Sequence, residues 1–258
     1  MVTERADPTG ELDALARELD LFALREKLPE LLSTAEKSGT SYTDFALGLL
    51  RVEAQARADR RLARNRKRSR LPPVVAGLDG FDFSARPQLE ARVVRELLEC
   101  RWLDEGRNVI CVGRPGLGKT RILDAVADAA LKARRTVLRT TAADMLDDLQ
   151  GSLADGTYQR TLRRYMKPAA LYLDEFGCAP FDAKATNHLF RIVANRHLLQ
   201  LPILLAANAG FRHWQTFFPS EAQAVATVDR LIDRATILRF SGKSFRRPQD
   251  VHGAETDE

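Results

Sequence analysis

A glycine-rich motif ends in a lysine and a threonine in the middle of the chain. It reads Gly113-Arg114-Pro115-Gly116-Leu117-Gly118-Lys119-Thr120 and fits the Walker A spacing G-x-x-x-x-G-K-[ST]. Glycines let the backbone curl so that its N–H groups point at phosphates, and the helix that follows presents its positive N-terminal end. Lys119 would lie near the β and γ phosphates, and the Thr120 hydroxyl could bind Mg²⁺. A chance glycine-rich turn is the alternative, but a strand before and a helix after favour a nucleotide site.

A second acidic motif follows an apolar run about 55 residues later. The segment Ala-Leu-Tyr-Leu ends in Asp174-Glu175. Asp174 could hold Mg²⁺ through water, and Glu175 could polarise the attacking water. An exposed acidic pair at a strand end is the alternative, which the Walker A motif upstream disfavours. The pair also favours an ATPase over a small GTPase, and the guanine-reading motif Asn-Lys-x-Asp is absent from the sequence.

Asn208 ends the next apolar run, Ile-Leu-Leu-Ala-Ala-Asn. An amide at the end of a strand beside Asp174 could hydrogen-bond both the γ-phosphate and the water, as a sensor. A turn asparagine close to Gly210 is the alternative interpretation.

Short apolar runs alternate with amphipathic helical patterns from residue 86 onward. The runs are residues 109–113, 136–140, 170–175, 203–208 and 237–240, with helices such as 120–134 and 183–199 between them. Crossovers of this length predict a five-stranded parallel sheet between helices, an α/β P-loop NTPase fold.

The first 70 residues have a different pattern, which predicts a small N-terminal α-helical domain. Leucine and phenylalanine recur at helical spacing over residues 11–35, and a break follows at Ser38-Gly39-Thr40. Ser41 and Asp44 then resemble a capping box that begins a second helix, which ends before Pro72. We therefore expect a helical domain over residues 1–70, a linker over 71–85, the nucleotide-binding core over 86–247 and a disordered tail over 248–258.

The end of this second helix is strongly basic. Residues 51–70 hold nine Lys or Arg against the acids Glu53 and Asp59, a net +7 where the whole chain carries +5. Helical spacing places many of these cations on one face, which suits phosphate contacts on duplex DNA. A solvated charged face is the alternative, but acids for i, i+4 pairing are scarce. The predicted DNA contacts are Arg57, Arg60, Arg61, Arg64, Arg66, Lys67, Arg68 and Arg70. A weaker basic cluster, Arg160, Arg163, Arg164 and Lys167, suits DNA or a subunit contact.

Other features narrow the class of protein. The sequence has no apolar run of the ~18 residues that a membrane span needs, and its acidic N-terminus is unlike a secretory signal. Three scattered cysteines predict neither a disulfide framework nor a zinc site, and Cys178 is interpreted as a packing residue. We expect a cytoplasmic protein in which Trp102 and Trp214 are packing anchors.

Beyond these motifs, the chain resembles the IstB-like ATP-binding proteins, transposition helper AAA+ ATPases related to the DnaC helicase loaders. The resemblance covers nearly the whole chain. It rests on residues 81–84 (FDFS), the Walker A motif, 138–146 (LRTTAADML), 171–182 (LYLDEFGCAPFD), 206–214 (AANAGFRHW), 228–231 (VDRL) and 237–246 (ILRFSGKSFR).

This resemblance implies an AAA+ core, here without the C-terminal helical lid, that binds ATP and Mg²⁺. It implies self-assembly on DNA and a transposase partner. Arg230 matches the family's arginine finger, which reaches the neighbouring subunit's ATP, and Arg246 matches a second sensor arginine. Four positions depart from the family pattern: Ala206 and Ala207 before Asn208, Arg121 after the Walker threonine, and Cys178. These departures are expected to affect the rate of ATP turnover more than the binding of the nucleotide.

Three other functions remain open at this stage. A replicative helicase loader shares the fold, although a helicase-binding segment would present apolar and acidic contacts rather than arginines. A small-molecule kinase is disfavoured by Glu175 and the basic helix. A nucleotide-binding assembly protein with negligible turnover is disfavoured by Glu175 alone.

Overall fold

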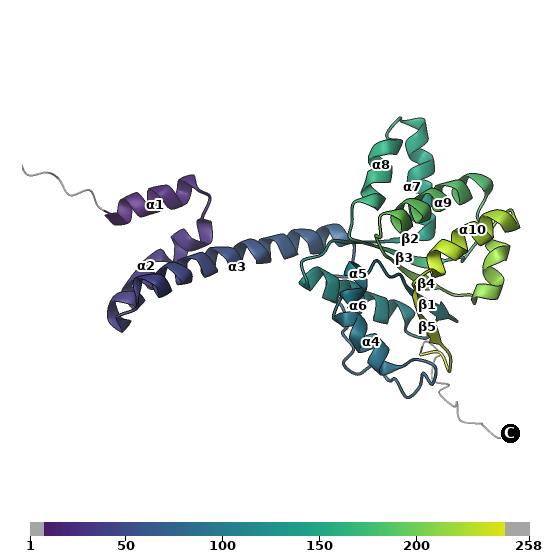
Figure 1. The fold of residues 1–258 in the computed structure, drawn as a ribbon, viewed down its shortest axis with the longest axis horizontal. Helices are drawn as coiled ribbons and strands as arrows, with labels where there is room; N and C mark the ends of the chain where they lie inside the picture. Colours follow the sequence, from purple (N-terminus) through teal and green to yellow (C-terminus); the bar gives the residue numbers. More distant parts are fainter. Residues whose placement is uncertain (1–7, 246–258) are drawn as a thin grey trace, which may run out of the picture. The chain divides into compact units, whose positions relative to one another are not determined.

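The computed structural model describes residues 8–245, and a five-stranded parallel sheet forms the centre of the larger part of the chain (Figure 1). The strand order is β2-β3-β4-β1-β5, so β1 lies between β4 and β5. The strands are β1 (Val109–Gly113), β2 (Val137–Thr141), β3 (Ala170–Phe176), β4 (Ile203–Ala207) and β5 (Thr236–Phe240). The carboxyl ends of β1, β3 and β4 therefore meet at one edge, where parallel α/β sheets bind ligands.

Helices cover both faces of this sheet (Figure 1). One face carries α4 (Ala91–Leu98) and α6 (Lys119–Lys132), with the short α5 (Arg101–Asp104) nearby. The other carries α7 (Ala142–Ala154), α8 (Tyr158–Met166), α9 (Ala183–Leu198) and α10 (Glu221–Ile232), with the 3₁₀ segment η1 (Phe211–Phe217). Because both faces are covered, strands such as β4 are buried along their whole length.

The predicted fold class is confirmed by this topology. Each observed strand lies within one or two residues of its predicted range, because continuous apolar runs are what a doubly covered parallel sheet requires. The described part of the chain ends at residue 245 and contains no helical lid after β5. Trp102 and Trp214 are buried packing residues, as predicted.

The N-terminal region consists of α1 (Pro8–Glu18), α2 (Phe22–Ser38) and α3 (Tyr42–Ser69). The single periodic stretch of residues 11–35 is in fact two helices, because Asp20 adopts a left-handed conformation with φ of 54°. The serine half of the predicted capping box is present, with the Asp44 N–H donating to Ser41 Oγ at 3.1 Å, while the Asp44 carboxylate accepts from the Ser41 hydroxyl at 2.7 Å.

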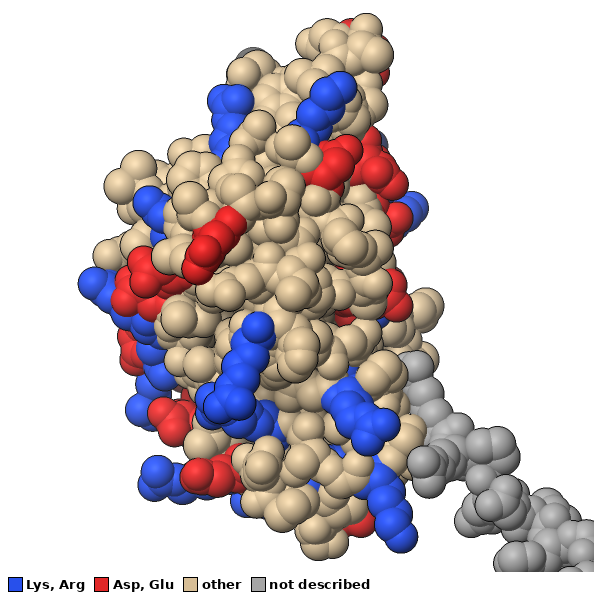
Figure 2. Space-filling model, turned by 90° about the vertical axis from the view of Figure 1, so that its right-hand side faces the viewer, with Lys and Arg blue, Asp and Glu red and all other residues tan. Residues whose placement is uncertain are grey.

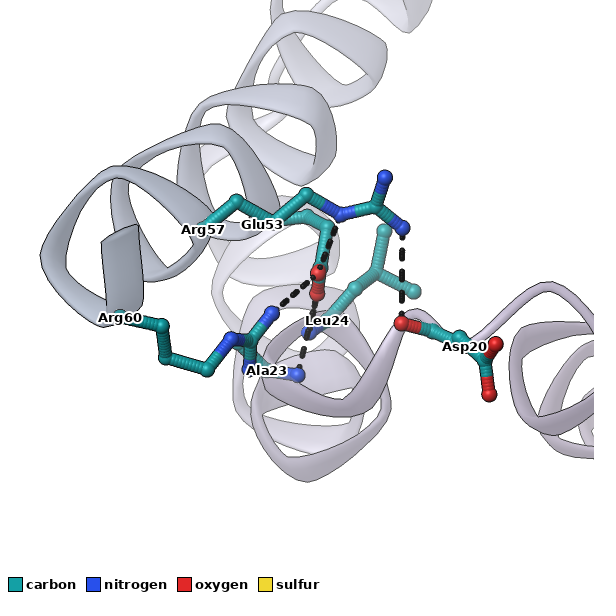
Figure 3. A network of polar contacts seen from close by, with 6 residues as sticks. All are labelled: Asp20, Ala23, Leu24, Glu53, Arg57 and Arg60. Atoms are coloured by element: carbon teal, nitrogen blue, oxygen red, sulfur yellow. Dashed lines mark hydrogen bonds and ion pairs between the residues drawn. The ribbon is translucent and has the colours of Figure 1, made fainter. Parts of the chain in front are cut away.

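A buried carboxylate joins α3 to the start of α2 (Figure 3). Glu53 Oε2 accepts the Ala23 and Leu24 N–H groups at 3.0 and 3.2 Å, and so satisfies free donors of the first turn of α2. Its Oε1 accepts from Arg57 and Arg60, each at 2.9 Å.

The chain forms two compact units, which divide between Arg64 and Asn65. The division falls inside α3, six residues before the boundary expected from the sequence. The last turns of α3 belong to the core because Arg66 pairs with Asp128 of α6 and Ser69 is fully buried. The tail expected over residues 248–258 lies outside the described residues. Over residues 8–245, no helix is both long and apolar enough to cross a membrane.

Candidate functional site

The Walker A loop connects β1 to α6 and is held in its curled form by packing. Gly116 and Gly118 have φ values of 79° and 93°, which glycine adopts without strain. A Cβ at Gly118 would lie 2.8 Å from the Phe81 ring, so the loop has no room for a side chain there. Lys119 is only 6% exposed, and its ammonium donates to the carbonyls of Gly113 and Arg114 at 2.6 and 2.9 Å.

A cavity of about 590 Å³ lies beside this loop. It brings together five of the positions predicted to act on phosphate, metal or water: Lys119, Thr120, Asp174, Glu175 and Asn208. Pro115 to Lys119 also line it, whereas Gly113 and Arg114 contribute only through the carbonyls that hold Lys119. The remaining lining residues are Gly80, Phe81, Asp82, Arg121, Arg139 and Phe245.

The acidic pair stands at an irregular point of β3. The register between β3 and β4 shifts between Leu173 and Phe176, and Glu175 has a φ of 55°. This positive φ is uncommon for a residue with a side chain, and such strain concentrates at functional sites. Asp174 is buried while Glu175 is exposed, so the bulge turns adjacent carboxylates into different environments.

Asn208 directly follows β4 and donates from Nδ2 to Cys178 Sγ at 3.2 Å. Cys178, interpreted from the sequence as a packing residue, is exposed. The reason is the turn after Glu175, which carries Cys178 out of the core toward the end of β4.

An arginine in β2 was missed by the sequence analysis. Arg139 lines the cavity, and its Nη2 donates to Asp174 Oδ2 at 2.8 Å. Its Nε lies 3.5 Å from Asp124 Oδ1 on α6. Burial raises the pKa of Asp124 to about 6, although Arg139 opposes that rise. The available signal was a cation inside an apolar strand, since a charge in such a position needs a partner.

Residues from both ends of the core also contribute to the wall of the cavity. Arg121 donates to the carbonyls of Gly77 and Asp79, and Phe81 packs against Phe83 and Phe245. The Phe245 N–H donates to the Gly116 carbonyl at 2.9 Å. Fully buried Arg86 donates to the Leu117 carbonyl at 3.0 Å and stacks on the Phe245 ring. Phe81 and Phe245 thus add aromatic surface to the cavity lining, and no sequence motif had marked either of them as a cavity residue.

The residues present fit a nucleoside triphosphate with Mg²⁺. The loop supplies backbone curvature that a Cβ at Gly118 would destroy, and Lys119 supplies a cation. Thr120 and Asp174 offer a hydroxyl and a carboxylate, the oxygen ligands that Mg²⁺ takes at phosphate sites. Among the described residues, no group of three or more His, Cys, Asp or Glu side chains forms a separate metal site.

Arg230 lies on α10 and does not line this cavity. Its Nη1 donates to the Ala226 carbonyl at 2.6 Å, and its guanidinium packs over the Phe190 ring. Arg246, the predicted second sensor, lies outside the described residues.

The predicted DNA contacts fall into two groups, one in each unit. In the N-terminal unit, Arg57 and Arg60 both pair with Glu53, an acid that the sequence argument had discounted (Figure 3). A shallow cavity of about 660 Å³ is lined by Arg57, Arg60, Arg61 and Arg64, by one acid, Asp20, and by the exposed side chains of Leu19 and Phe22.

In the core unit, Arg66 pairs with Asp128, and Lys67 is exposed. Arg68 and Arg70 line a pocket of about 370 Å³ together with Arg164 and Lys167, two members of the second basic cluster. The fold thus places cations that are about a hundred residues apart in sequence around one pocket. No acidic residue in the described part of the chain lines this pocket. On the face of the core shown in Figure 2, basic and acidic side chains are interspersed, and basic ones are more frequent in the lower half of the view.

Comparison with known proteins agrees with this geometry. The family model described as IstB-like ATP binding protein matches residues 14–252. The chain is 31% identical over 236 residues to the ATP-binding protein of insertion sequence IS21 from Pseudomonas aeruginosa, covering 92% of this chain and 88% of that protein. It is 30% identical over 228 residues to the ATP-binding protein of IS5376 from Geobacillus stearothermophilus, covering 88% and 90%.

A solved DNA replication initiation factor is similar in fold, with a TM-score of 0.54 and 25% identity over 66% of this chain and 50% of that one. The sheet order, the Walker A loop and the match over most of the chain lead to one conclusion. The chain belongs to the family of IstB-like ATP-binding proteins, with a P-loop AAA+ core.

Proposed function

We propose that this protein hydrolyses ATP and assembles on duplex DNA, where it assists a transposase in selecting its target. The observation that carries the ATPase part is the single cavity shared by Lys119, Thr120, Asp174, Glu175 and Asn208. Insertion-sequence relatives that match over about nine-tenths of their length support the link to transposition.

Each residue at the cavity has a definite task in this proposal. Lys119 and the loop N–H groups hold the phosphates, and Thr120 with Asp174 would hold Mg²⁺. Bound there, Mg²⁺ would neutralise charge on the phosphates. Glu175 is exposed to the cavity and orients the attacking water, and Asn208 hydrogen-bonds the γ-phosphate from the end of β4. The aromatic rings of Phe81 and Phe245 in the cavity lining suit the base.

DNA binding is supported by the charge that remains after internal pairing. Arg57, Arg60 and Arg66 are held by acids. The other predicted contacts have no ion pair among the described residues: Arg61, Arg64, Lys67, Arg68 and Arg70. These five cations are therefore the best candidates for phosphate contacts. Such contacts give affinity with strong salt dependence and little base specificity.

The test is duplex DNA binding, by fluorescence anisotropy, and particle size, by sedimentation, with ATP, with ADP and without nucleotide. We expect ATP-dependent assembly on DNA that Lys119→Ala abolishes and Glu175→Gln prolongs, because the first loses phosphate binding and the second retains unhydrolysed ATP. Assembly that is the same in every nucleotide state would contradict the proposal.

The DNA-binding surface is tested by paired substitutions. Arg61→Ala with Arg64→Ala, and Arg68→Ala with Arg70→Ala, should each lower the slope of log affinity against log salt by about 1 for every phosphate that the variant no longer binds. Arg92→Ala with Arg95→Ala, two exposed α4 positions, removes the same charge as a control. Arg57 and Arg60 are left intact because their loss would leave the buried Glu53 carboxylate without a paired cation. If wild type ignores duplex DNA at moderate salt, the helicase-loader alternative replaces this proposal.

A further inference from the structure

Arg139 lies between two carboxylates at the edge of the nucleotide cavity. Its Nη2 is 2.8 Å from Asp174 Oδ2, and its Nε is 3.5 Å from Asp124 Oδ1. The two acids come from different elements, β3 and α6, and their side chains are only 11% and 12% exposed. Arg139 itself, at 27% exposed, lines the cavity. The contact with Asp174 is a charge-assisted hydrogen bond, which is strong where water is partly excluded, whereas the longer contact with Asp124 is an ion pair without a hydrogen bond.

Both oxygens of Asp174 are already engaged. Oδ1 accepts the Glu175 N–H at 3.0 Å, and Oδ2 accepts from Arg139. The carboxylate assigned above to Mg²⁺ thus has an internal cation bound to it. Asp124 offers that cation a second carboxylate without any movement of the backbone.

We infer that Arg139 is a positioning residue that acts as an exchangeable counter-ion for Asp174. In the nucleotide-free protein Arg139 holds Asp174 and neutralises it. Arg139 gives up Oδ2 when Asp174 binds Mg²⁺, and it then stays in place through Asp124. This inference rests on the proposed function, because it assumes that Asp174 belongs to a metal–nucleotide site.

Two binding constants should then respond to Arg139 in opposite directions. Arg139 competes with a divalent cation for Asp174, so its removal should strengthen metal binding. Arg139 also offsets two negative charges beside the phosphate site, so its removal should weaken the binding of a nucleotide without metal. If Arg139 only maintained the fold, its removal would weaken both the binding of the metal and the binding of the metal-free nucleotide.

The experiment compares wild type with Arg139→Gln in two titrations. Mn²⁺ is titrated without nucleotide and followed by electron paramagnetic resonance of the free ion, and a fluorescent ATP analogue is titrated in EDTA. We expect Mn²⁺ to bind at least about tenfold more tightly to Arg139→Gln, and the analogue at least about tenfold more weakly. Arg139→Lys keeps the charge and should hold the affinity for the metal-free analogue near the wild-type value. Arg135→Gln removes an arginine that pairs with Asp104 away from the cavity, and it should change neither affinity.

Changes in the same direction, or no change in either constant, would overturn the inference. If Arg139→Gln does not fold, the side-chain NMR signal of Arg139 in wild type decides the matter, with Arg139→Lys used for its assignment. That signal should shift when Mg²⁺ is added to the ADP-bound protein, and an unchanged signal would refute the exchange. The Mn²⁺ titration needs no nucleotide. A wild type that binds Mn²⁺ but no ATP would therefore sink the proposed ATPase, while equal Mn²⁺ affinities of wild type and Arg139→Gln would separately overturn the counter-ion role of Arg139.

Discussion

At the scale of single residues, the acidic pair is positioned by the residues that follow it. Phe176 is buried against Trp214, with ring centroids 4.9 Å apart, and it also contacts Phe181 and Phe217. Gly177 then turns the chain with a φ of 71°. The strained φ of Glu175 persists because this aromatic cluster fixes the next residue.

Gly177 is therefore expected to tolerate no side chain. A Cβ there would lie 2.0 Å from the Phe217 ring, and the left-handed conformation would be strained as well. Gly177→Ala should lower the free energy of unfolding by at least about 2 kcal/mol, measured by urea denaturation. The control is Gly151→Ala in α7, where a Cβ meets nothing within 4 Å and should be neutral or stabilising. Equal effects of the two substitutions would refute the steric argument.

The sequence predicted those site residues that belong to contiguous motifs. The Walker A loop and Asp174-Glu175 carry their spacing in the chain itself, and the fold places them around one cavity. Arg139, Phe81 and Phe245 enter the same cavity from segments far apart, and their partners became visible only when β2 was placed beside β3. Pairing across a sheet is not encoded in local spacing.

At the scale of elements, Glu53 acts as the cap of a helix to which it does not belong. Burial raises its pKa, but hydrogen bonds from Arg57, Leu24, Arg60 and Ala23 outweigh this effect and hold the pKa below its ordinary value. The carboxylate is therefore ionised in the folded unit. Its negative charge also lies near the positive end of α2, where it is favourable.

A pH dependence follows from this lowered pKa. The stability that ionised Glu53 contributes is fully present above its unfolded pKa of about 4.3, and it is lost as pH falls through the lower folded value. Glu53→Gln should destabilise α2 by about 2 kcal/mol at pH 7, and the difference from wild type should shrink at more acidic pH. Hydrogen exchange of the α2 amides, corrected for intrinsic rates, measures this difference. Glu30→Gln, an exposed change in the same helix, should leave exchange unaltered, and a pH-independent gap would contradict the prediction.

The elements themselves were largely predictable, with one instructive exception. A fully apolar run such as β4 is interpreted as a buried strand when helical patterns flank it. The strands, and their alternation with helices along the chain, therefore followed from the sequence. The break between α1 and α2 was missed because hydrophobic spacing continues across Asp20. Its causes are a left-handed residue and a cap supplied from α3, and neither leaves a local turn signature.

At the scale of the whole molecule, the placement of Arg230 implies that one subunit does not complete the proposed catalytic site. Arg230 does not line the cavity of its own chain, and its guanidinium packs over the ring of Phe190 on α9. If it acts as an arginine finger, it must reach a neighbouring subunit through a head-to-tail interface. The proposed assembly on DNA is then a requirement for turnover rather than a by-product of binding.

Mixing two inactive variants tests this requirement. Glu175→Gln lacks the water-orienting carboxylate but keeps Arg230, whereas Arg230→Ala keeps an intact cavity. With random mixing in equal amounts, about one quarter of interfaces would pair an intact cavity with an intact finger. DNA-stimulated ATPase activity should therefore return in the mixture to a substantial fraction of wild type while each variant alone stays nearly inactive. Arg234→Ala, an exposed position four residues later, should retain activity by itself. A mixture no more active than its components would show that Arg230 does not serve a neighbour's site, because an interface with both groups intact would have formed without restoring hydrolysis.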